Sequence, residues 1–309
     1  MYRRGGCVLP LNNLFMQKVS VPHKDLEKIA APEQPTGIQL LVLDIDGTIA
    51  GQSNEIRQPV LSAIKAAQSR GVLVAIATGR MYRSALRFHR EVGSTLPLLA
   101  YQGAWIQDPA TQQLHGHWPV SRQTAQQLLD YFEQPQLRSL LSVHFYINDE
   151  LYVRELTPQT QIYSERSGIE PIPVGDLRRV LTNEPTKVLA LSDDTDVIDQ
   201  MLGSLRQQYT PAQLYLTKSV ATFFEATNPF VNKGVGVRYL AQELLRLQAT
   251  NVMAIGDNFN DVEMIEYAGI GVAMGNAPAD VKAIAQWVAP SVEQDGAAAA
   301  IEEFLLRNA

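Results

Sequence analysis

Two pairs of aspartates stand where buried strands are expected to end. Asp44 and Asp46 are separated by one residue and are followed by Gly47, which permits a sharp turn. Asp257 and Asp261 form a second acidic cluster far along the sequence. Carboxylates that are brought together repel one another unless a cation joins them, and a divalent metal with oxygen ligands meets that need. The sequence therefore predicts a metal site, and Mg²⁺ is the expected ion because it favours phosphate-containing sites.

Other interpretations of these segments are weaker. A calcium loop starting at Asp257 needs an oxygen-bearing side chain at its third position and glycine at its sixth, where this chain has Phe259 and Val262. The glycines of segment 269–275 miss the dinucleotide-binding spacing by one residue, and no P-loop sequence occurs. An ordinary Asp-Gly turn is the alternative for segment 44–48, and the second acidic cluster favours a site.

Short apolar segments precede these polar residues. Residues 38–43 are almost continuously apolar, which is typical of a strand buried on both faces of a parallel sheet. Residues 72–77 and 252–255 have the same character and end at Thr78-Gly79-Arg80 and Gly256-Asp257. Because helical patterns lie between them, the expected fold class is α/β, with a Rossmann-like parallel sheet as its core. Ligands of such sheets bind beyond the carboxyl ends of the strands, so these polar residues are expected to share one site.

Helical spacing of apolar residues predicts the connecting helices. One such pattern covers residues 56–64, with Ser53 or Asn54 as the expected N-cap. Another helix is expected to begin near Met81, with Thr78 as a candidate N-cap.

The order of these patterns predicts a core that is interrupted by an insertion. Residues 1–35 mix glycine, proline and charges without a sustained period and are interpreted as an N-terminal extension. Residues 36–118 and 228–309 carry the strand and helix patterns of the core. Residues 119–227 alternate in hydrophobicity between polar helical stretches, which predicts an inserted α+β cap domain.

Composition narrows the class of protein. The apolar fraction of 46% and the charged fraction of 19% are those of a soluble globular protein. A net charge of −6 argues against sequence-independent binding of nucleic acid, which depends on Lys and Arg. No apolar run approaches the roughly 20 residues that span a bilayer. We therefore expect a cytoplasmic protein with no nucleic-acid or membrane partner, and its single cysteine, Cys7, forms no internal disulfide.

Four motifs, in fixed order, resemble those of the haloacid dehalogenase (HAD) superfamily. They are Asp44-x-Asp46-Gly47-Thr48, Thr78, Lys233 and Gly256-Asp257-x-x-Asn260-Asp261. The long insertion between Thr78 and Lys233 is similar to that of the Cof-type phosphatase branch (subclass IIB), which carries a C2B cap. The resemblance extends from about Thr36 to the C-terminus. The chain departs from the branch pattern at Gln102-Gly103-Ala104, where Asn-Gly-Ala is usual, so a substrate contact at this position is not implied.

The resemblance implies phosphoryl transfer in two steps. Asp44 would attack phosphorus and form an aspartyl-phosphate, and Asp46 would protonate the leaving group and then activate water. Lys233 is the third implied catalytic residue, because its charge can meet both the phosphate and Asp44. The implied phosphate-binding residues are Ile45, Thr78, Gly79, Lys233 and Asn260. The implied metal ligands are Asp44, Asp46 through its carbonyl, Asp257, and Asp261, either through water or by orienting Lys233.

Residues outside these motifs carry weaker signals. Arg80 is equally compatible with a substrate contact and with the surface of a helix. His144, Tyr146, Tyr152 and Arg154 could face the site from the insertion, but His and Tyr on alternating strands are more often packing residues, so they are not assigned to it.

The expected function is Mg²⁺-dependent hydrolysis of a small phosphorylated metabolite, such as a sugar phosphate or a phosphorylated cofactor or flavin precursor. A phosphotransferase or phosphomutase on the same core is an alternative. A non-catalytic regulatory module that binds a phosphorylated ligand is a second alternative, which the complete set of motif residues disfavours. The sequence leaves the substrate and the oligomeric state open.

Overall fold

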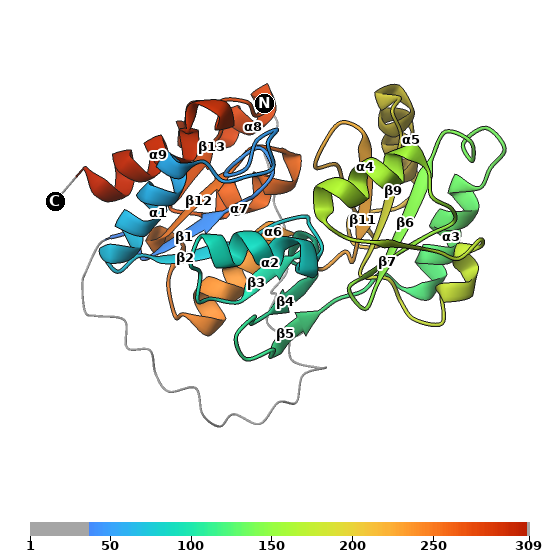
Figure 1. Cartoon of the computed structure of the whole chain (residues 1–309), viewed down its shortest axis with the longest axis horizontal. Coiled ribbons are helices and arrows are strands. Elements are labelled where there is room, and N and C mark those ends of the chain that lie inside the picture. The colour runs from blue at the N-terminus through green and yellow to red at the C-terminus, as the bar shows by residue number, and fades with distance from the viewer. Residues whose placement is uncertain (1–36, 308–309) are drawn as a thin grey trace, which may run out of the picture. The chain divides into compact units, whose positions relative to one another are not determined.

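The computed structural model describes residues 37–307, in which the strands form three sheets (Figure 1). The five-stranded sheet is parallel throughout and has the order β14-β13-β12-β1-β2. Its strands are β1 (Leu40–Leu43), β2 (Leu73–Ile76), β12 (Val252–Gly256), β13 (Ile270–Ala273) and β14 (Trp287–Val288). Blue strands from the first third of the chain thus lie beside orange strands from its last third (Figure 1). The predicted α/β class is confirmed.

Helices cover both faces of this sheet. They are α1 (Gln58–Ser69), α2 (Tyr82–Glu91), α6 (Lys233–Arg238), α7 (Val262–Tyr267), α8 (Ala279–Ile284) and α9 (Gly296–Ile301). Alternate residues of β1 belong to different apolar clusters: Leu41 packs with residues of α1 and α9, and Val42 packs with residues of α6 and α7. Both faces of β1 are buried, which explains why its sequence is apolar without alternation.

A six-stranded, mostly antiparallel sheet is inserted between the two parts of the parallel sheet, in the order β10-β11-β9-β6-β7-β8. Its strands are β6 (Ser142–Ile147), β7 (Glu150–Val153), β8 (Pro171–Pro173), β9 (Lys187–Leu191), β10 (Tyr215–Thr217) and β11 (Phe223–Thr227), and its helices are α3 (Arg122–Phe132), α4 (Pro158–Ser167) and α5 (Thr195–Gln208). Phe145, Val188 and Phe224 pack on one side with residues of α3 and α5. Because side chains alternate along a strand, Tyr146, Lys187 and Glu225 lie on the opposite side.

A small antiparallel sheet leads from the core into the insertion. It consists of β3 (Leu98–Ala100), β4 (Trp105–Gln107) and β5 (Leu114–His117). The chain returns after β11 at Asn228, whose Nδ2 donates to the carbonyl oxygen of Pro119 at 2.8 Å. The two connections between core and insertion are therefore joined by a hydrogen bond.

Both predictions for the N-cap of the first helix are wrong. Neither Ser53 nor Asn54 caps α1, which begins at Gln58 with Arg57 in the N-cap position and proline in its first turn. Proline fixes the backbone at a helical φ and is favoured in the first turn, so it sets the start of α1 later than the polar residues suggested.

Thr78 does not cap the next helix. α2 begins at Tyr82, with Met81 in the N-cap position. The hydroxyl of Thr78 instead accepts a hydrogen bond from the backbone N–H of Arg80 at 3.1 Å, so it closes a local turn at the end of β2.

The predicted extension, residues 1–35, and Cys7 lie outside the described residues. Among residues 37–307, no helix is both long enough and apolar enough to cross a membrane.

Candidate active site

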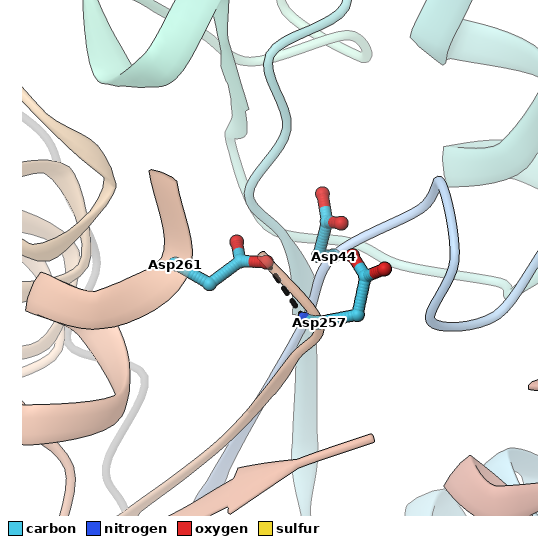
Figure 2. Close-up of side chains that lie close together, drawn as sticks. All are labelled: Asp44, Asp257 and Asp261. Atoms are coloured by element: carbon cyan, nitrogen blue, oxygen red, sulfur yellow. Dashed lines mark hydrogen bonds between the residues drawn. The ribbon is translucent and has the colours of Figure 1, made fainter. Parts of the chain in front are cut away.

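The ends of β1 and β12 bring two of the predicted aspartates together. Asp44 follows β1, and its backbone N–H donates to the carbonyl oxygen of Ile255 on β12 at 3.1 Å. Asp257 follows β12, and Asp261 lies one helical turn later, before α7. One carboxylate oxygen from each of the three aspartates lies within 4.8 Å of the others. Figure 2 shows the carboxylates gathered beyond the strand ends.

Lys233 is buried among these carboxylates. Its Nζ donates to Oδ1 of Asp44 at 2.6 Å and to Oδ1 of Asp261 at 2.5 Å, and the residue is 1% exposed. Lys233 begins α6 after the N-cap Asn232. Gly234 then allows α6 to approach α7, because a Cβ at this position would lie 2.5 Å from the carbonyl oxygen of Glu263.

The carboxylates outnumber the one ammonium group beside them. Burial, reinforced by the charge of Asp261, raises the pKa of Asp44 to about 7, although Lys233 opposes this shift. Burial and the charges of Asp261 and Asp44 raise the pKa of Asp257 to about 9. Burial disfavours the charged form of Lys233, but Asp261 and Asp44 outweigh it and raise its pKa. This negative excess, presented through oxygen atoms, fits a divalent cation.

Asp261 already has partners for both of its oxygens. Oδ1 accepts from Lys233, and Oδ2 accepts the backbone N–H groups of Asp257 at 2.8 Å and Asn258 at 3.0 Å. The bond to Asp257 is the dashed line in Figure 2. Asp44 and Asp257 therefore have more remaining capacity to bind a metal than Asp261 has.

Gly47 packs directly against the acidic cluster. Its φ is +77°, which favours glycine, and a Cβ would lie 2.1 Å from Oδ2 of Asp257, so a larger residue would displace this carboxylate. Asn276 connects the same two residues, because its Nδ2 donates to the carbonyl oxygen of Gly47 at 2.9 Å and to Oδ2 of Asp257 at 3.0 Å. Sequence analysis missed Asn276, although its position shortly after β13 is another strand end at the same edge of the sheet.

Two arginines bind the carboxylate of Asp46. Arg80 binds it in a bidentate manner, with Nε 2.7 Å from Oδ2 and Nη2 2.6 Å from Oδ1, and Arg166 of α4 approaches Oδ1 at 3.2 Å. Burial alone would raise the pKa of Asp46, but the hydrogen bond and charge of Arg80 outweigh it and lower the pKa. The helix-surface interpretation of Arg80 is therefore wrong, since its side chain is only 9% exposed. Arg166 was not identified from the sequence.

The other predicted phosphate-binding residues line the same edge of the sheet. Thr78 and Asn260 are buried, and the carbonyl oxygen of Gly79 accepts from Nζ of Lys187 at 2.8 Å. Ile45 is buried between the two aspartates, and its carbonyl oxygen accepts the N–H of Ala50 at 2.9 Å. All of the predicted site residues thus follow β1, β2 or β12 or begin α6.

Residues of the insertion behave largely as packing residues. His144 is fully buried, its Nε2 lies 2.9 Å from the hydroxyl of Thr160, and burial lowers its pKa to about 3. Tyr146 is fully buried, and the hydroxyl of Tyr152 donates to Glu150 at 2.7 Å. Arg154 pairs with acidic residues of the insertion.

A buried ion pair of the insertion escaped sequence analysis. Nζ of Lys187 lies 3.0 Å from Oε2 of Glu225, and their side chains are 4% and 1% exposed. Lys187 also reaches the carbonyl oxygen of Gly79, so this pair touches the core at a predicted phosphate-binding residue. No local motif marks either residue, because they meet only when β9 and β11 pair.

Comparisons with known proteins identify the family of this chain. The family model of haloacid dehalogenase-like hydrolases matches residues 41–301. A 5-amino-6-(5-phospho-D-ribitylamino)uracil phosphatase of Bacillus subtilis is 29% identical over 275 residues, which cover 86% of this chain and 97% of the relative.

Two solved structures share the fold. A haloacid dehalogenase-like hydrolase from Bacteroides thetaiotaomicron has a TM-score of 0.74 at 24% identity, covering 86% of this chain and 99% of the other. A HAD subclass IIB sugar phosphatase has a TM-score of 0.73 at 21% identity, covering 86% and 98%. The chain therefore belongs to the haloacid dehalogenase-like hydrolases, in the Cof-type phosphatase branch.

Proposed function

We propose that the chain is a Mg²⁺-dependent phosphatase that hydrolyses small phosphomonoesters with Asp44 as its nucleophile. The observation that carries the proposal is the contact between Asp44 and Lys233, at 2.6 Å, beside Asp257 and Asp261. The ammonium group holds one oxygen of Asp44, which leaves the other oxygen available for attack. This arrangement lies at the strand ends where ligands of α/β sheets bind.

The first step transfers the phosphoryl group to Asp44. A carboxylate oxygen attacks phosphorus, the bond between phosphorus and the ester oxygen breaks, and the leaving alkoxide takes a proton from Asp46. Arg80 and Arg166 hold Asp46 in the charged form in this closed arrangement, so the first step requires their hold to loosen. We infer that substrate binding displaces Arg166, the partner that belongs to the insertion.

The second step returns the enzyme to its starting state. Asp46 takes a proton from water, the water oxygen attacks phosphorus, and the bond from phosphorus to Asp44 breaks to release inorganic phosphate. The ionised Asp46 that Arg80 stabilises suits this step, because a general base must be deprotonated.

The remaining residues stabilise charge on the transferring group. Phosphoryl transfer depends mainly on positioning and charge neutralisation, so donors around the phosphorus are the main requirement. Lys233 supplies a cation, and Thr78, Gly79 and Asn260 supply a hydroxyl, a backbone N–H and an amide.

The acidic cluster suits Mg²⁺. Asp44 and Asp257 would bind it through their carboxylates and Asp46 through its carbonyl oxygen, while Asp261 orients Lys233. The ion would neutralise charge on the phosphoryl oxygens during transfer.

The substrate is proposed to be a sugar phosphate or a phosphorylated cofactor or flavin precursor. The relative from Bacillus subtilis is named for its action on 5-amino-6-(5-phospho-D-ribitylamino)uracil, and the similarity covers 86% of this chain and 97% of the relative. This compound therefore belongs in the first panel of substrates.

We further propose that residues 119–227 form a cap over the site. Arg166 and Lys187 of this segment contact Asp46 and Gly79, so opening of the cap would expose the site and closing would exclude water. The expected hinges are residues 116–119 and Asn228-Pro229, where glycine and proline interrupt the chain. Solution scattering should change when Mg²⁺ and a phosphate analogue are added; identical curves would count against a moving cap.

Phosphate release from a panel of phosphomonoesters tests the function. We expect release with Mg²⁺, none with EDTA, and a loss of about 10⁴-fold or more in Asp44→Asn. Transfer to an added sugar hydroxyl instead of water would indicate a phosphotransferase, and absence of both activities would support a binding module.

A further inference from the structure

Gln102 is the residue at which the chain departs from the usual Cof-type pattern. It lies directly after β3 in a short helical turn, Tyr101–Gly103, and its side chain is completely buried. Its φ is +60° and its ψ is 27°, a left-handed conformation that residues other than glycine rarely adopt. Strained backbone of this kind is retained mainly where the surrounding structure or a function requires it.

The side-chain amide of Gln102 joins the insertion to the core. Its Nε2 donates to Oε2 of Glu225 at 3.2 Å, and its Oε1 accepts from Nδ2 of Asn260 at 3.1 Å. Gly79 lies against the same amide, because a Cβ on Gly79 would be 2.4 Å from Nε2 of Gln102. Gln102 therefore touches two of the proposed phosphate-binding residues and one acidic residue of the insertion.

The acidic partner of Gln102 is itself fixed by the insertion. Oε2 of Glu225 also accepts from Nζ of Lys187, which donates in turn to the carbonyl oxygen of Gly79. Lys187 and Glu225 lie on the neighbouring strands β9 and β11, so both belong to the insertion and not to the core. A continuous set of hydrogen bonds thus connects the ion pair of the insertion, through Gln102, to Asn260.

The geometry points to Gln102 as a positioning residue: we propose that it orients the amide of Asn260 toward the phosphoryl group when the Lys187–Glu225 pair is docked. This inference rests on the proposed function, because it assigns Asn260 a contact with phosphate. An amide nitrogen carries two N–H groups, so Asn260 can donate one to Gln102 and the other to a phosphoryl oxygen.

The length of the Gln102 side chain matters for this role. Asparagine has the same amide but is shorter by one C–C bond, about 1.5 Å, so it cannot reach both Glu225 and Asn260 from the same backbone position. Oδ1 of Asn260 is buried and has no hydrogen-bond partner among residues 37–307, so the bond from its Nδ2 to Gln102 holds the orientation of this amide.

A double-mutant cycle between Gln102 and Asn260 tests the inference. With p-nitrophenyl phosphate and Mg²⁺, we expect Gln102→Asn to lower kcat about tenfold and also to raise KM, because a misoriented Asn260 holds the phosphoryl oxygen less well in the bound substrate and still less well in the transition state. In an Asn260→Ala background the same substitution should have no further effect. An equal loss in both backgrounds would overturn the proposal, because Gln102 would then act independently of Asn260.

An exchange of side chains tests the connection to the insertion. Gln102→Glu places two carboxylates face to face, and the added substitution Glu225→Gln restores one amide and one carboxylate at this contact. We expect the double variant to recover most of the kcat that Gln102→Glu loses. Failure to recover would refute the role of Glu225.

Gln68 provides a matched control, because its Nε2 donates to the carbonyl oxygens of Val92 and Gly93, each at 3.1 Å. Gln68→Asn should lower the melting temperature and leave kcat within about twofold, which separates loss of a structural amide from loss of positioning.

Titration with inorganic phosphate separates this inference from the proposed function. If the wild-type chain releases no phosphate from any ester, the proposed function fails. Calorimetric titration with orthophosphate and Mg²⁺ still tests Gln102, because Gln102→Asn should bind about tenfold more weakly than the wild type. Equal affinity would contradict the positioning role, and folding of each variant can be checked by its melting transition.

Discussion

Two buried lysines lie at the candidate active site in different surroundings. Lys233 belongs to the core and lies among the carboxylates of Asp44 and Asp261, whereas Lys187 belongs to the insertion and lies between Glu225 and the backbone of Gly79. They are only 1% and 3% exposed. Lys233 offsets part of an excess of negative charge, and among residues 37–307 Lys187 has a single carboxylate as its ionic partner. The comparison suggests that the core lysine serves the chemistry and that the lysine of the insertion serves positioning.

The largest effect on activity and stability is expected when Lys233 is replaced. Lys233→Met should lower kcat about a thousandfold or more, because it removes a cation beside the transferring group. It should also destabilise the chain by about 3 to 5 kcal/mol, since it leaves buried carboxylates without a counter-charge. Phosphate release and calorimetric melting measure the two effects, with the exposed Lys65→Met as control. A Lys233→Met enzyme within tenfold of the wild type would contradict the catalytic role.

Replacing the ion pair of the insertion should have a smaller effect. In Lys187→Met/Glu225→Met both charges are removed together, so the free energy of unfolding should change by less than about 1 to 2 kcal/mol. Activity should nevertheless fall about tenfold, because the contacts to Gly79 and Gln102 are lost. Comparison of melting temperature with kcat separates these outcomes, and unchanged kcat would show that the pair has no part in the site.

The acidic cluster should make stability depend on pH and on metal. Asp44 and Asp257 have pKa values of about 7 and about 9 in the folded chain, above the value of about 4 of an unfolded aspartate. Their contribution to stability is therefore complete below about pH 4 and is lost as the pH rises toward 9.

The metal-free protein should accordingly melt at lower temperature at pH 9 than at pH 5. Mg²⁺ should raise the melting temperature more at pH 8 than at pH 5, because it binds the deprotonated carboxylates. Asp257→Asn should flatten the pH dependence. The contrary result would be a metal-free wild type whose melting temperature rises with pH in the same way as that of Asp257→Asn. The pH dependence of stability would then not come from Asp44 and Asp257.

The smallest effect is expected at Arg166. Its side chain is 45% exposed and it approaches Asp46 at 3.2 Å, so the contact is weak and is screened by salt. Arg166→Ala should lower KM about two- to threefold at low salt, because substrate binding no longer has to displace this contact, and the difference should vanish at high salt. Arg178→Ala, which removes contacts confined to the insertion, is the control. A loss of a hundredfold would mean that Arg166 belongs with the catalytic residues.

The sequence predicts which residues of the core come together, because the order of the strands brings them to one edge of the sheet. Asp44 and Asp257 follow apolar segments that had to be buried parallel strands, and the carboxyl ends of such strands share one edge. The contacts of Arg166, Lys187 and Glu225 depend on how the insertion docks, which no local pattern records. The contacts of the Gln102 side chain also depend on how the insertion docks. The sequence marked only the position of this residue, which stands where the family pattern usually has asparagine.

The predictions of the helix N-caps were wrong for a local reason. Ser53, Asn54 and Thr78 are good capping residues, but proline in the first turn set the start of α1, and the hydroxyl of Thr78 found a backbone N–H within its own turn. Several local hydrogen bonds are available to such residues, and the tertiary structure selects one of them.

Trapping of the phosphorylated enzyme tests the central claim most directly. The protein is mixed with a ³²P-labelled phosphomonoester and Mg²⁺, quenched in acid within one turnover, and digested. We expect the label on the peptide that contains Asp44, with no label in Asp44→Asn. Rapid phosphate release without a labelled peptide, or label on another residue, would contradict Asp44 as the nucleophile.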